Sequence, residues 1–432
     1  MEAYLSNEQE VTAANEINRK KQKVNLLAVI IIIELVLGGS GRLIAFGSLL
    51  TIRYILFLFA LAYFAASFVK NKFTLKRKAF YIDIILFFFM FFVSLASGIY
   101  RGYDLGNILR TSQGYLYLLI YFPFSIMINN TEKSKKMHTL FANCTVVLAI
   151  ISIAIFVIFK LNPSSYSIIT PILNRFNYGY IAMRGGLPAV FLKTSPYMAI
   201  GFIIFLFQFI NIKDKRNITN LIKLLLLLIG CIATMSMGIW IAVFVGVFLV
   251  IVLSEGKYKR AAIISIAFIS VIIMVLFLGY ISESLGNRLS TSDSSYIVKF
   301  NQLLTLIDYW AKHPLLGNGF GVEVTFTSEL GTREMINFEL FWVQILVNMG
   351  ILGFLLYSNI IVKALYYSIR TWKDIPKNDM VLIKSLGVGL IALCIVSSVN
   401  PFLNNPIGIG YLILVLSTIS VYTKENLNYE KT

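Results

Sequence analysis

The chain has 432 residues, of which 58% are hydrophobic and only 14% are charged, and its formal net charge at pH 7 is +17. A soluble domain would carry roughly 25% charged residues, whereas apolar runs long enough to cross a bilayer recur along this chain. The composition therefore excludes a soluble globular protein and predicts an all-α, polytopic membrane protein. In such a protein the positive charge is typical of cytoplasmic loops rather than of nucleic-acid binding.

The hydropathy pattern predicts about twelve transmembrane helices. The second is the weakest because Arg53 interrupts it, and the seventh and eighth are separated only by Ser-Met-Gly. The predicted spans lie near residues 25–40, 48–69, 80–99, 109–128, 139–159, 196–212, 221–235, 237–253, 261–280, 338–358, 381–398 and 405–422.

Basic clusters in the short loops set the orientation. The loops near residues 70–78, 133–136, 213–216 and 257–260 are rich in Lys and Arg and fall on one side, which is then cytoplasmic. We expect residues 1–24 and 423–432 to be cytoplasmic segments and residues 25–422 to form one transmembrane domain. The two halves show no repeat of the kind found in transporters.

Two long loops are expected on the outer face, near residues 160–195 and 281–337. Loops of this length are usually functional or disordered. In the second loop, apolar residues at helical spacing over 297–313 predict an amphipathic surface helix. Pro314 and the glycines at 317, 319 and 321 end that helix and predict a turn into the next span.

Arginine is concentrated on the predicted outer face, whereas lysine predominates on the cytoplasmic side. The guanidinium group binds phosphate or carboxylate through two parallel hydrogen bonds and stays charged. A set of outward arginines therefore indicates a site for an anionic substrate, such as a lipid-linked diphosphate. These arginines are Arg42, Arg53, Arg101, Arg110, Arg175, Arg184, Arg288 and Arg333, accompanied by Lys160, Lys193, Lys299 and Lys312.

The alternative for any one of these arginines is contact with lipid headgroups or pairing with an acid. Glu34, which lies inside a predicted span, is either a partner of an arginine such as Arg53 or a proton site. Asp83 follows a cytoplasmic basic cluster and is expected at the membrane interface. The predicted outer face has no Asp-x-Asp pair and no His/Cys cluster with ligand spacing, so we expect no metal and no cofactor.

Two segments carry a resemblance to a known family. Residues 299–321, KFNQLLTLIDYWAKHPLLGNGFG, and 338–353, FELFWVQILVNMGILG, resemble the signature region of the O-antigen ligase and Wzy polymerase superfamily. In that pattern a basic residue, here Lys299, lies fourteen positions before the His of His-Pro-Leu-Leu-Gly-x-Gly, here His313. The upstream segment 183–202 resembles the family's first outer loop, with Arg184 in the expected place.

The sequence departs from the family pattern at two positions. Lys299 stands where the family usually has Arg, which keeps a point charge but loses the guanidinium fork. Glu339 stands where O-antigen ligases carry a His. This second departure favours the polymerase branch.

The resemblance implies an enzyme of the bacterial cytoplasmic membrane that joins undecaprenyl-diphosphate-linked oligosaccharides into a capsule, exopolysaccharide or O-antigen. A sugar hydroxyl attacks the anomeric carbon of the donor, and arginines stabilise the departing diphosphate. We assign this role to Arg184 and Arg288. The base is Glu339 or His313, with Asp293 third. The other expected substrate contacts are Arg175, Lys193, Lys299, Arg333, Arg53 and Arg110.

Several alternatives stay open at this point. His313 either acts as a base or fixes the turn by hydrogen bonds to carbonyl groups, and Glu339 either acts as a base or pairs with Arg333 or another loop cation. The protein is a polymerase, a ligase that transfers the glycan to another cell-envelope acceptor, or a flippase. Expected partners are the lipid bilayer, lipid-linked oligosaccharides, a flippase and a chain-length regulator, without nucleic acid.

Overall fold

The computed structural model describes residues 24–42, 45–46, 50–72, 79–184, 187–254, 294–328, 331–370 and 375–423. The predicted span near 261–280, Arg288 and Asp293 lie outside the described residues, as do residues 1–23 and 424–432. The number of membrane crossings and the domain boundaries therefore stay predictions.

Within those ranges the fold is a helical bundle. Each of the other eleven predicted spans contains helix, and short helices and strands fill the connections. The elements before residue 131 are α2 (Leu26–Leu37), β1 (Ala45–Phe46), β2 (Leu50–Thr51), α3 (Ile52–Lys70), α4 (Tyr81–Tyr100), α5 (Leu105–Leu116), η1 (Tyr117–Ile120) and α6 (Tyr121–Met127). The following elements are α7 (Thr131–Leu161), η2 (Pro163–Ser165), α8 (Tyr166–Arg175), β3 (Gly179–Arg184), β4 (Leu187–Leu192), α9 (Pro196–Asn211), η3 (Lys213–Lys215), α10 (Ile218–Ala233) and α11 (Met237–Leu253). The last elements are α14 (Ser294–Lys312), β5 (Val324–Ser328), β6 (Gly331–Met335), α15 (Phe341–Ile369), α16 (Lys377–Ser397) and α17 (Pro406–Tyr422).

Five of these helices, α3, α4, α7, α15 and α16, are long and apolar enough to cross a membrane, and α2, α9, α10, α11 and α17 are apolar but shorter. Helices α9, α16 and α17 are buried over most of their surface, whereas most apolar side chains of α3 are partly or fully exposed. A helix that is apolar all round belongs in the interior of such a bundle. The arrangement supports a multi-pass membrane protein with α9, α16 and α17 at its centre.

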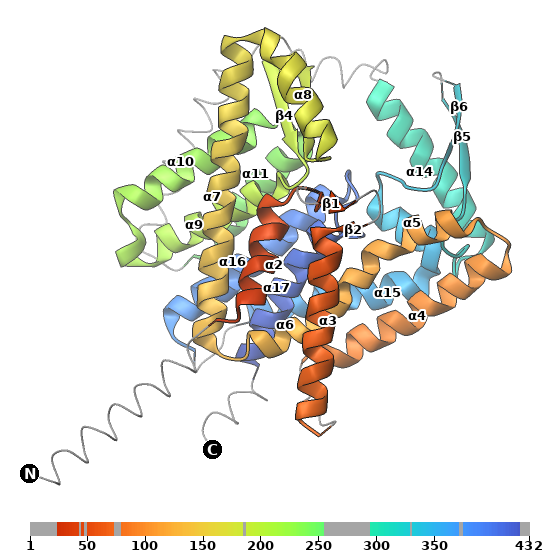
Figure 1. The fold of residues 1–432 in the computed structure, drawn as a ribbon, viewed down its shortest axis with the longest axis horizontal. Coiled ribbons are helices and arrows are strands. Elements are labelled where there is room, and N and C mark those ends of the chain that lie inside the picture. The colour runs from red at the N-terminus through yellow and green to blue at the C-terminus, as the bar shows by residue number, and fades with distance from the viewer. Residues whose placement is uncertain are drawn as a thin grey trace, which may run out of the picture.

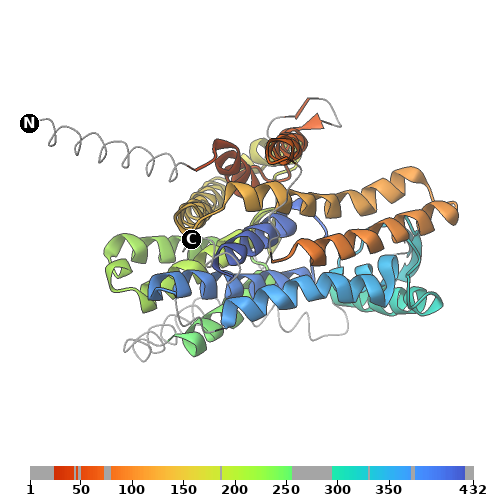
Figure 2. The same cartoon turned by 90° about the horizontal axis from the view of Figure 1, so that it is seen from below.

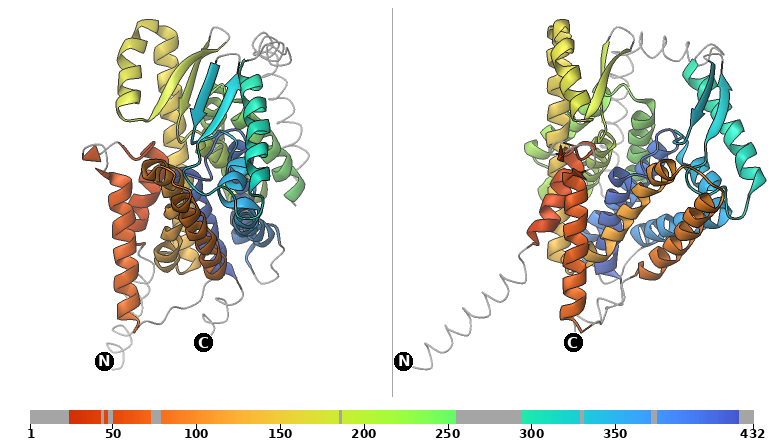
Figure 3. Two further views of the ribbon diagram at one scale, coloured as in Figure 1. Left: turned by 90° about the vertical axis from the view of Figure 1, so that its right-hand side faces the viewer. Right: turned by 45° about the vertical axis from the view of Figure 1, so that its right-hand side comes forward.

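Both predicted outer loops carry ordered structure on one end of the bundle. Helix α7 rises above the bundle and carries α8 with the β3–β4 hairpin, and α14 rises beside the β5–β6 hairpin at the same end (Figures 1 and 3). The lower end of α3 and the last turn of α17 lie at the opposite end (Figure 3). In the perpendicular view, α3 is seen nearly end-on while α4 and α15 lie along their length (Figure 2).

The mostly helical structure fits the predicted all-α fold, to which it adds three short antiparallel hairpins. β3 pairs with β4, as in Ile181 with Val190, and β5 pairs with β6, as in Phe326 with Arg333. The short pair β1–β2 precedes α3. These strands have two to six residues. β1 and β2 are too short for the alternation that identifies a strand in a sequence, whereas β3 to β6 lie in the two segments that the sequence analysis predicted as outer loops.

The predicted surface helix over 297–313 is α14, whose buried side chains Gln302 and Leu306 lie one turn apart. Leu306 packs in a small apolar cluster with Val322, Val324, Phe338 and Val347. This cluster joins α14 to the first strand of the hairpin and to the start of α15. The helix is thus fixed to the bundle by its apolar stripe.

Helix α15 is broken at Gly350, which has the dihedral angles φ 65° and ψ −171°. The first half, Phe341–Met349, and the second half, Ile351–Ile369, are therefore separate helical segments. A break leaves backbone groups without partners inside the helix, and such groups must be satisfied within the protein at membrane depth. The sequence analysis predicted a single span near 338–358 and did not anticipate the break.

The turn over residues 313–321 supplies the missing partners. The amides of Asn318 and Gly319 donate to the carbonyls of Val347 and Asn348 at 2.7 and 3.0 Å, and the amide of Ile351 donates to the carbonyl of Pro314 at 2.9 Å. The same turn reaches α4, where the Phe320 amide donates to a backbone carbonyl at 3.2 Å. This docked turn, residues 313–321, therefore closes the break in α15 and fastens it to α4.

The three alternating glycines of the docked turn are required by its backbone. Gly317, Gly319 and Gly321 have φ values of 77°, 86° and 89°. A Cβ on Gly317 would lie 2.5 Å from the Gly350 nitrogen, and one on Gly319 would lie 2.5 Å from the nitrogen of Gly98 in α4. Both conformation and space therefore exclude a side chain at these positions.

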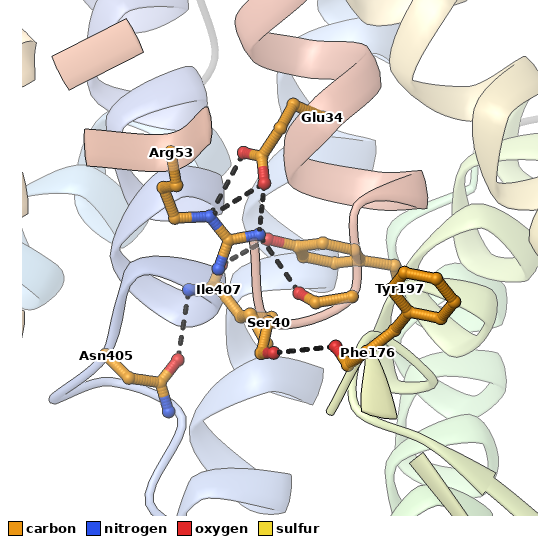
Figure 4. Close-up of polar contacts among 8 residues, drawn as sticks. Glu34, Ser40, Arg53, Phe176, Tyr197, Asn405 and Ile407 are labelled. Carbon is orange, nitrogen blue, oxygen red and sulfur yellow. Dashed lines mark hydrogen bonds and ion pairs between the residues drawn. The ribbon is translucent and has the colours of Figure 1, made fainter. Parts of the chain in front are cut away.

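A buried ion pair joins α2 to α3. The Arg53 Nη2 atom lies 2.9 Å from Glu34 Oε1, its Nε donates to both carboxylate oxygens, and Nη2 also donates to the Gly39 carbonyl at 3.0 Å (Figure 4). Beside the pair, the Tyr197 hydroxyl donates to the Ile407 carbonyl (Figure 4). The pairing of Glu34 with Arg53 that the sequence left as one alternative is the one found.

Asp83 ties α4 to the second half of α15. Lys363 Nζ lies 2.7 Å from its Oδ2 atom, and the Asn359 side-chain amide donates to Oδ1 at 3.0 Å. The Asp83 side chain is 12% exposed and that of Lys363 is 32% exposed. The pair is therefore only partly exposed, and the interfacial position of Asp83 stays a prediction.

We expect Gly319→Ala to destabilise the protein strongly. An alanine at the left-handed φ of this position costs about 1–2 kcal/mol. The clash of its Cβ with the α4 backbone adds an overpacking cost of roughly 1–3 kcal/mol. Gly102→Ala is the matched control because Gly102 has φ 75° with no atom within 4 Å of a Cβ. The measurement is the thermal midpoint in detergent, and equal midpoints for the two variants would contradict the docking described here.

Removing either partner of the Glu34–Arg53 pair should destabilise the fold by about 3–5 kcal/mol, because it leaves a buried charge without its partner. We expect Glu34→Gln and Arg53→Met each to reduce the yield of monodisperse protein. The double variant should lose less thermal stability than the sum of the losses in the two single variants. Additive losses in thermal stability would show that the two side chains do not interact.

Candidate functional site

Arg184 is placed at the end of β3, on the face that carries the hairpins. Its Nη1 atom donates to the carbonyl of Met235 at 2.6 Å. Met235 has a φ of 48° and forms the tight connection between α10 and α11. The side chain of Arg184 is half-buried, so its guanidinium is oriented by the protein before any substrate binds.

Lys299 and Glu339 form an ion pair, with 3.0 Å between Nζ and Oε2 and side-chain exposures of 32% and 51%. Lys299 also donates to the Val399 carbonyl at 3.4 Å, and the Glu339 amide donates to Gln302 Oε1 at 3.3 Å. Thus α14 and Glu339, which lies two residues before α15, are joined twice. The loop cation that pairs with Glu339 is Lys299.

The places where Arg184 and Lys299 are anchored lie next to each other. Gly238 at the start of α11 packs against Val399 in the α16–α17 connection, where an added Cβ would lie 2.9 Å from the valine Cγ2. Met235, which accepts from Arg184, is three residues before Gly238, and Val399 accepts from Lys299. One polar region at this end of the bundle therefore contains two cations and one carboxylate.

His313 is not part of this region. Lys299 and His313 are fourteen residues apart on and just beyond α14, which corresponds to roughly 20 Å along a helix. His313 is exposed, and its backbone, not its ring, shapes the turn: its amide donates to Trp310 and its carbonyl accepts from Gly317. Partial burial and the charges of Arg101 and Lys312 lower the pKa of His313.

The remaining predicted site residues are spread over the structure. Arg53 is buried against Glu34, which favours the structural alternative. Arg175 is exposed with its guanidinium 5.8 Å from the Phe176 ring, and Arg110 is exposed on α5. Burial and the charge of Arg42 lower the pKa of Lys193. Arg333 lies in β6.

Sequence reasoning missed the polar side chains that adjoin the ion pair. Trp342 Nε1 donates to Ser398 Oγ at 3.2 Å, and Asn404 Nδ2 donates to Gln344 Oε1 at 2.9 Å. The signal was the segment SSVNPFLNNP between two apolar spans, with three asparagines. Within the described ranges, no three His, Cys, Asp or Glu side chains are grouped so that they could hold a metal ion, and metal independence stays a prediction.

The sequence was compared with known proteins. A family profile described as O-antigen ligase matches residues 222–358. The chain is also 23% identical over 407 residues to a Shigella flexneri protein named O-antigen polymerase, covering 91% of this chain and 94% of that protein. Together with the apolar helices, these findings confirm the resemblance to the O-antigen ligase and Wzy polymerase superfamily that was predicted from the sequence.

Proposed function

We propose that this chain polymerises lipid-diphosphate-linked oligosaccharide repeat units at the outer face of the cytoplasmic membrane. The observation that carries the proposal is the polar region at the hairpin-bearing end of the bundle. There Arg184 and Lys299 donate to the adjoining α10–α11 and α16–α17 connections, and Lys299 pairs with Glu339. The similarity to a protein named O-antigen polymerase supports it. Both termini are then cytoplasmic.

In the proposed reaction an acceptor sugar hydroxyl attacks the anomeric carbon of the donor. The new glycosidic bond forms as the bond to the diphosphate oxygen breaks, and the lipid diphosphate leaves with the electron pair. Arg184 and Arg288 stabilise the charge that develops on the leaving group. Lys299 adds a further point charge.

Glu339 receives the proton of the attacking hydroxyl. Its Oε2 is held by Lys299 and its backbone by Gln302, so the carboxylate is positioned before substrate arrives. A positioned base contributes about 10²–10⁴-fold in rate. His313 lies roughly 20 Å along α14 from Lys299, the partner of Glu339, and the location of Glu339 within the polar region favours it as the base.

The second candidate is transfer of the finished glycan to another cell-envelope acceptor. The matching family profile, described as O-antigen ligase, favours it, whereas Glu339 in place of the ligase His does not. A flippase is the third alternative, and the placement of the polar residues on outer connections disfavours it.

Deleting the gene in its native strain should leave single repeat units on the lipid carrier, because the step that joins them is absent. The measurement is mass spectrometry of the lipid-linked fraction together with gel analysis of surface glycan. Full-length chains that remain on the carrier would contradict a polymerase and support the ligase. Repeat units trapped inside the cell would support the flippase.

Arg184→Lys and Arg288→Lys should each lower polymerisation by about tenfold or more, because the ammonium group cannot donate two parallel hydrogen bonds to a diphosphate. Chain length on gels is the readout, at matched expression. Arg101→Lys, an exposed arginine outside the site, is the control. Normal chain length in both site variants would show that the diphosphate assignment is wrong.

Glu339→Gln should reduce the rate about 10²–10⁴-fold, and His313→Gln should reduce it far less. Since the pKa of His313 is lowered, its ring keeps the neutral form to below pH 6.5. If His313 were the base, the polymerisation rate of the wild type would fall only below that pH. This fall would be absent in His313→Gln. Observing this pattern with an active Glu339→Gln would reverse the assignment.

A further inference from the structure

The connection between α16 and α17, residues 398–405, has polar groups that the diphosphate assignment does not use. It is fastened to the site by three contacts already described, from Lys299 to Val399, from Trp342 to Ser398 and from Asn404 to Gln344. Ser398 is exposed and Asn404 is half-buried. The connection therefore presents hydroxyl and carboxamide groups beside the Lys299–Glu339 pair.

Trp342 gives this surface a rigid aromatic component. The ring packs edge-on against Phe341 and Phe354, with centroid distances of 4.9 and 6.2 Å and interplanar angles of 67° and 75°. Its side chain stays half-exposed. Trp342 is three residues after Glu339, so an aromatic surface and a carboxylate lie close together. An indole is apolar on its face and polar at its nitrogen, so it suits a ligand that has both an apolar surface and polar groups.

The first half of α15 carries two buried side-chain carboxamides that follow Trp342 in the sequence. Gln344 and Asn348 are four residues apart and therefore lie on the same side of the helix. Both are 1% exposed. Gln344 accepts from Asn404, whereas neither side-chain atom of Asn348 has a hydrogen-bond partner among the described residues. Buried polar groups of native proteins are normally paired, so this amide indicates a partner from outside the chain, such as water or a ligand hydroxyl.

We propose that Trp342, Ser398 and Asn404 form the subsite for the acceptor sugar, a neutral pyranose whose hydroxyl lies toward Glu339, and that the buried Gln344 orients Asn404 within it. This inference rests on the proposed function and extends it. The three subsite side chains are uncharged, which suits sugar hydroxyl groups and not a phosphate, and Trp342 provides the apolar surface for the C–H face of the ring. Sites for small ligands commonly combine an aromatic wall with a few placed polar groups.

The test measures binding of the soluble repeat oligosaccharide to the purified full-length protein in nanodiscs. The oligosaccharide is released from the wild-type surface polymer by partial hydrolysis, and binding is followed by titration calorimetry. We expect Trp342→Ala to weaken binding about tenfold or more, Trp342→Phe to weaken it less, and Asn404→Ala to weaken it several-fold. Inorganic pyrophosphate should not displace the sugar.

Trp310→Phe is the matched control, because its indole nitrogen also donates to an oxygen, the Pro314 carbonyl, outside the subsite. It should bind the oligosaccharide as the wild type does. Wild-type affinity in a folded Trp342→Ala protein, or displacement of the sugar by pyrophosphate, would overturn the subsite. Neither outcome would contradict the proposed function. That function is contradicted instead if the deletion strain makes polymer of normal length.

Discussion

The structure depends on the break in α15 at Gly350 and on the turn that closes it. A helix interrupted within the membrane leaves amide and carbonyl groups that must find partners inside the protein. Residues 313–321 provide these partners with their own backbone. The alternating glycines allow the turn to approach α15 and α4 without side chains between the backbones. The most distinctive motif of the sequence is thus a structural element of the bundle.

This interaction also positions the candidate site. The docked turn follows directly on α14 and holds the end of the first half of α15, so it fixes the two elements that contribute Lys299 and Glu339. The apolar cluster around Leu306 makes the same connection from the side. The carboxylate and its cation are then held between a surface helix and the start of a broken one, with the α16–α17 connection beneath. Preorganisation of this kind is what a reaction with developing charge requires.

Much of this organisation could be predicted from the sequence, since apolar runs and helical spacing identify long elements reliably. The sequence predicted the surface helix α14 and a loop cation that pairs with Glu339. It also gave the Glu34–Arg53 pair as one of two alternatives. The hairpins were not predicted, because β3 to β6 lie in segments that hydropathy identifies only as loops, and neither was the kink, because Gly350 lies inside a mainly apolar segment of the length of one span. Trp342, Ser398 and Asn404 were missed because their roles depend on contacts between segments distant in the chain.

The central claim is that this chain itself joins lipid-linked repeat units. Its most direct test is reconstitution of the purified protein in proteoliposomes with the diphosphate-linked repeat unit as the sole substrate. The account predicts a ladder of products that grow by one repeat unit, with release of lipid diphosphate. Intact substrate in the presence of folded protein, or a product that forms only when a different acceptor is added, would contradict it.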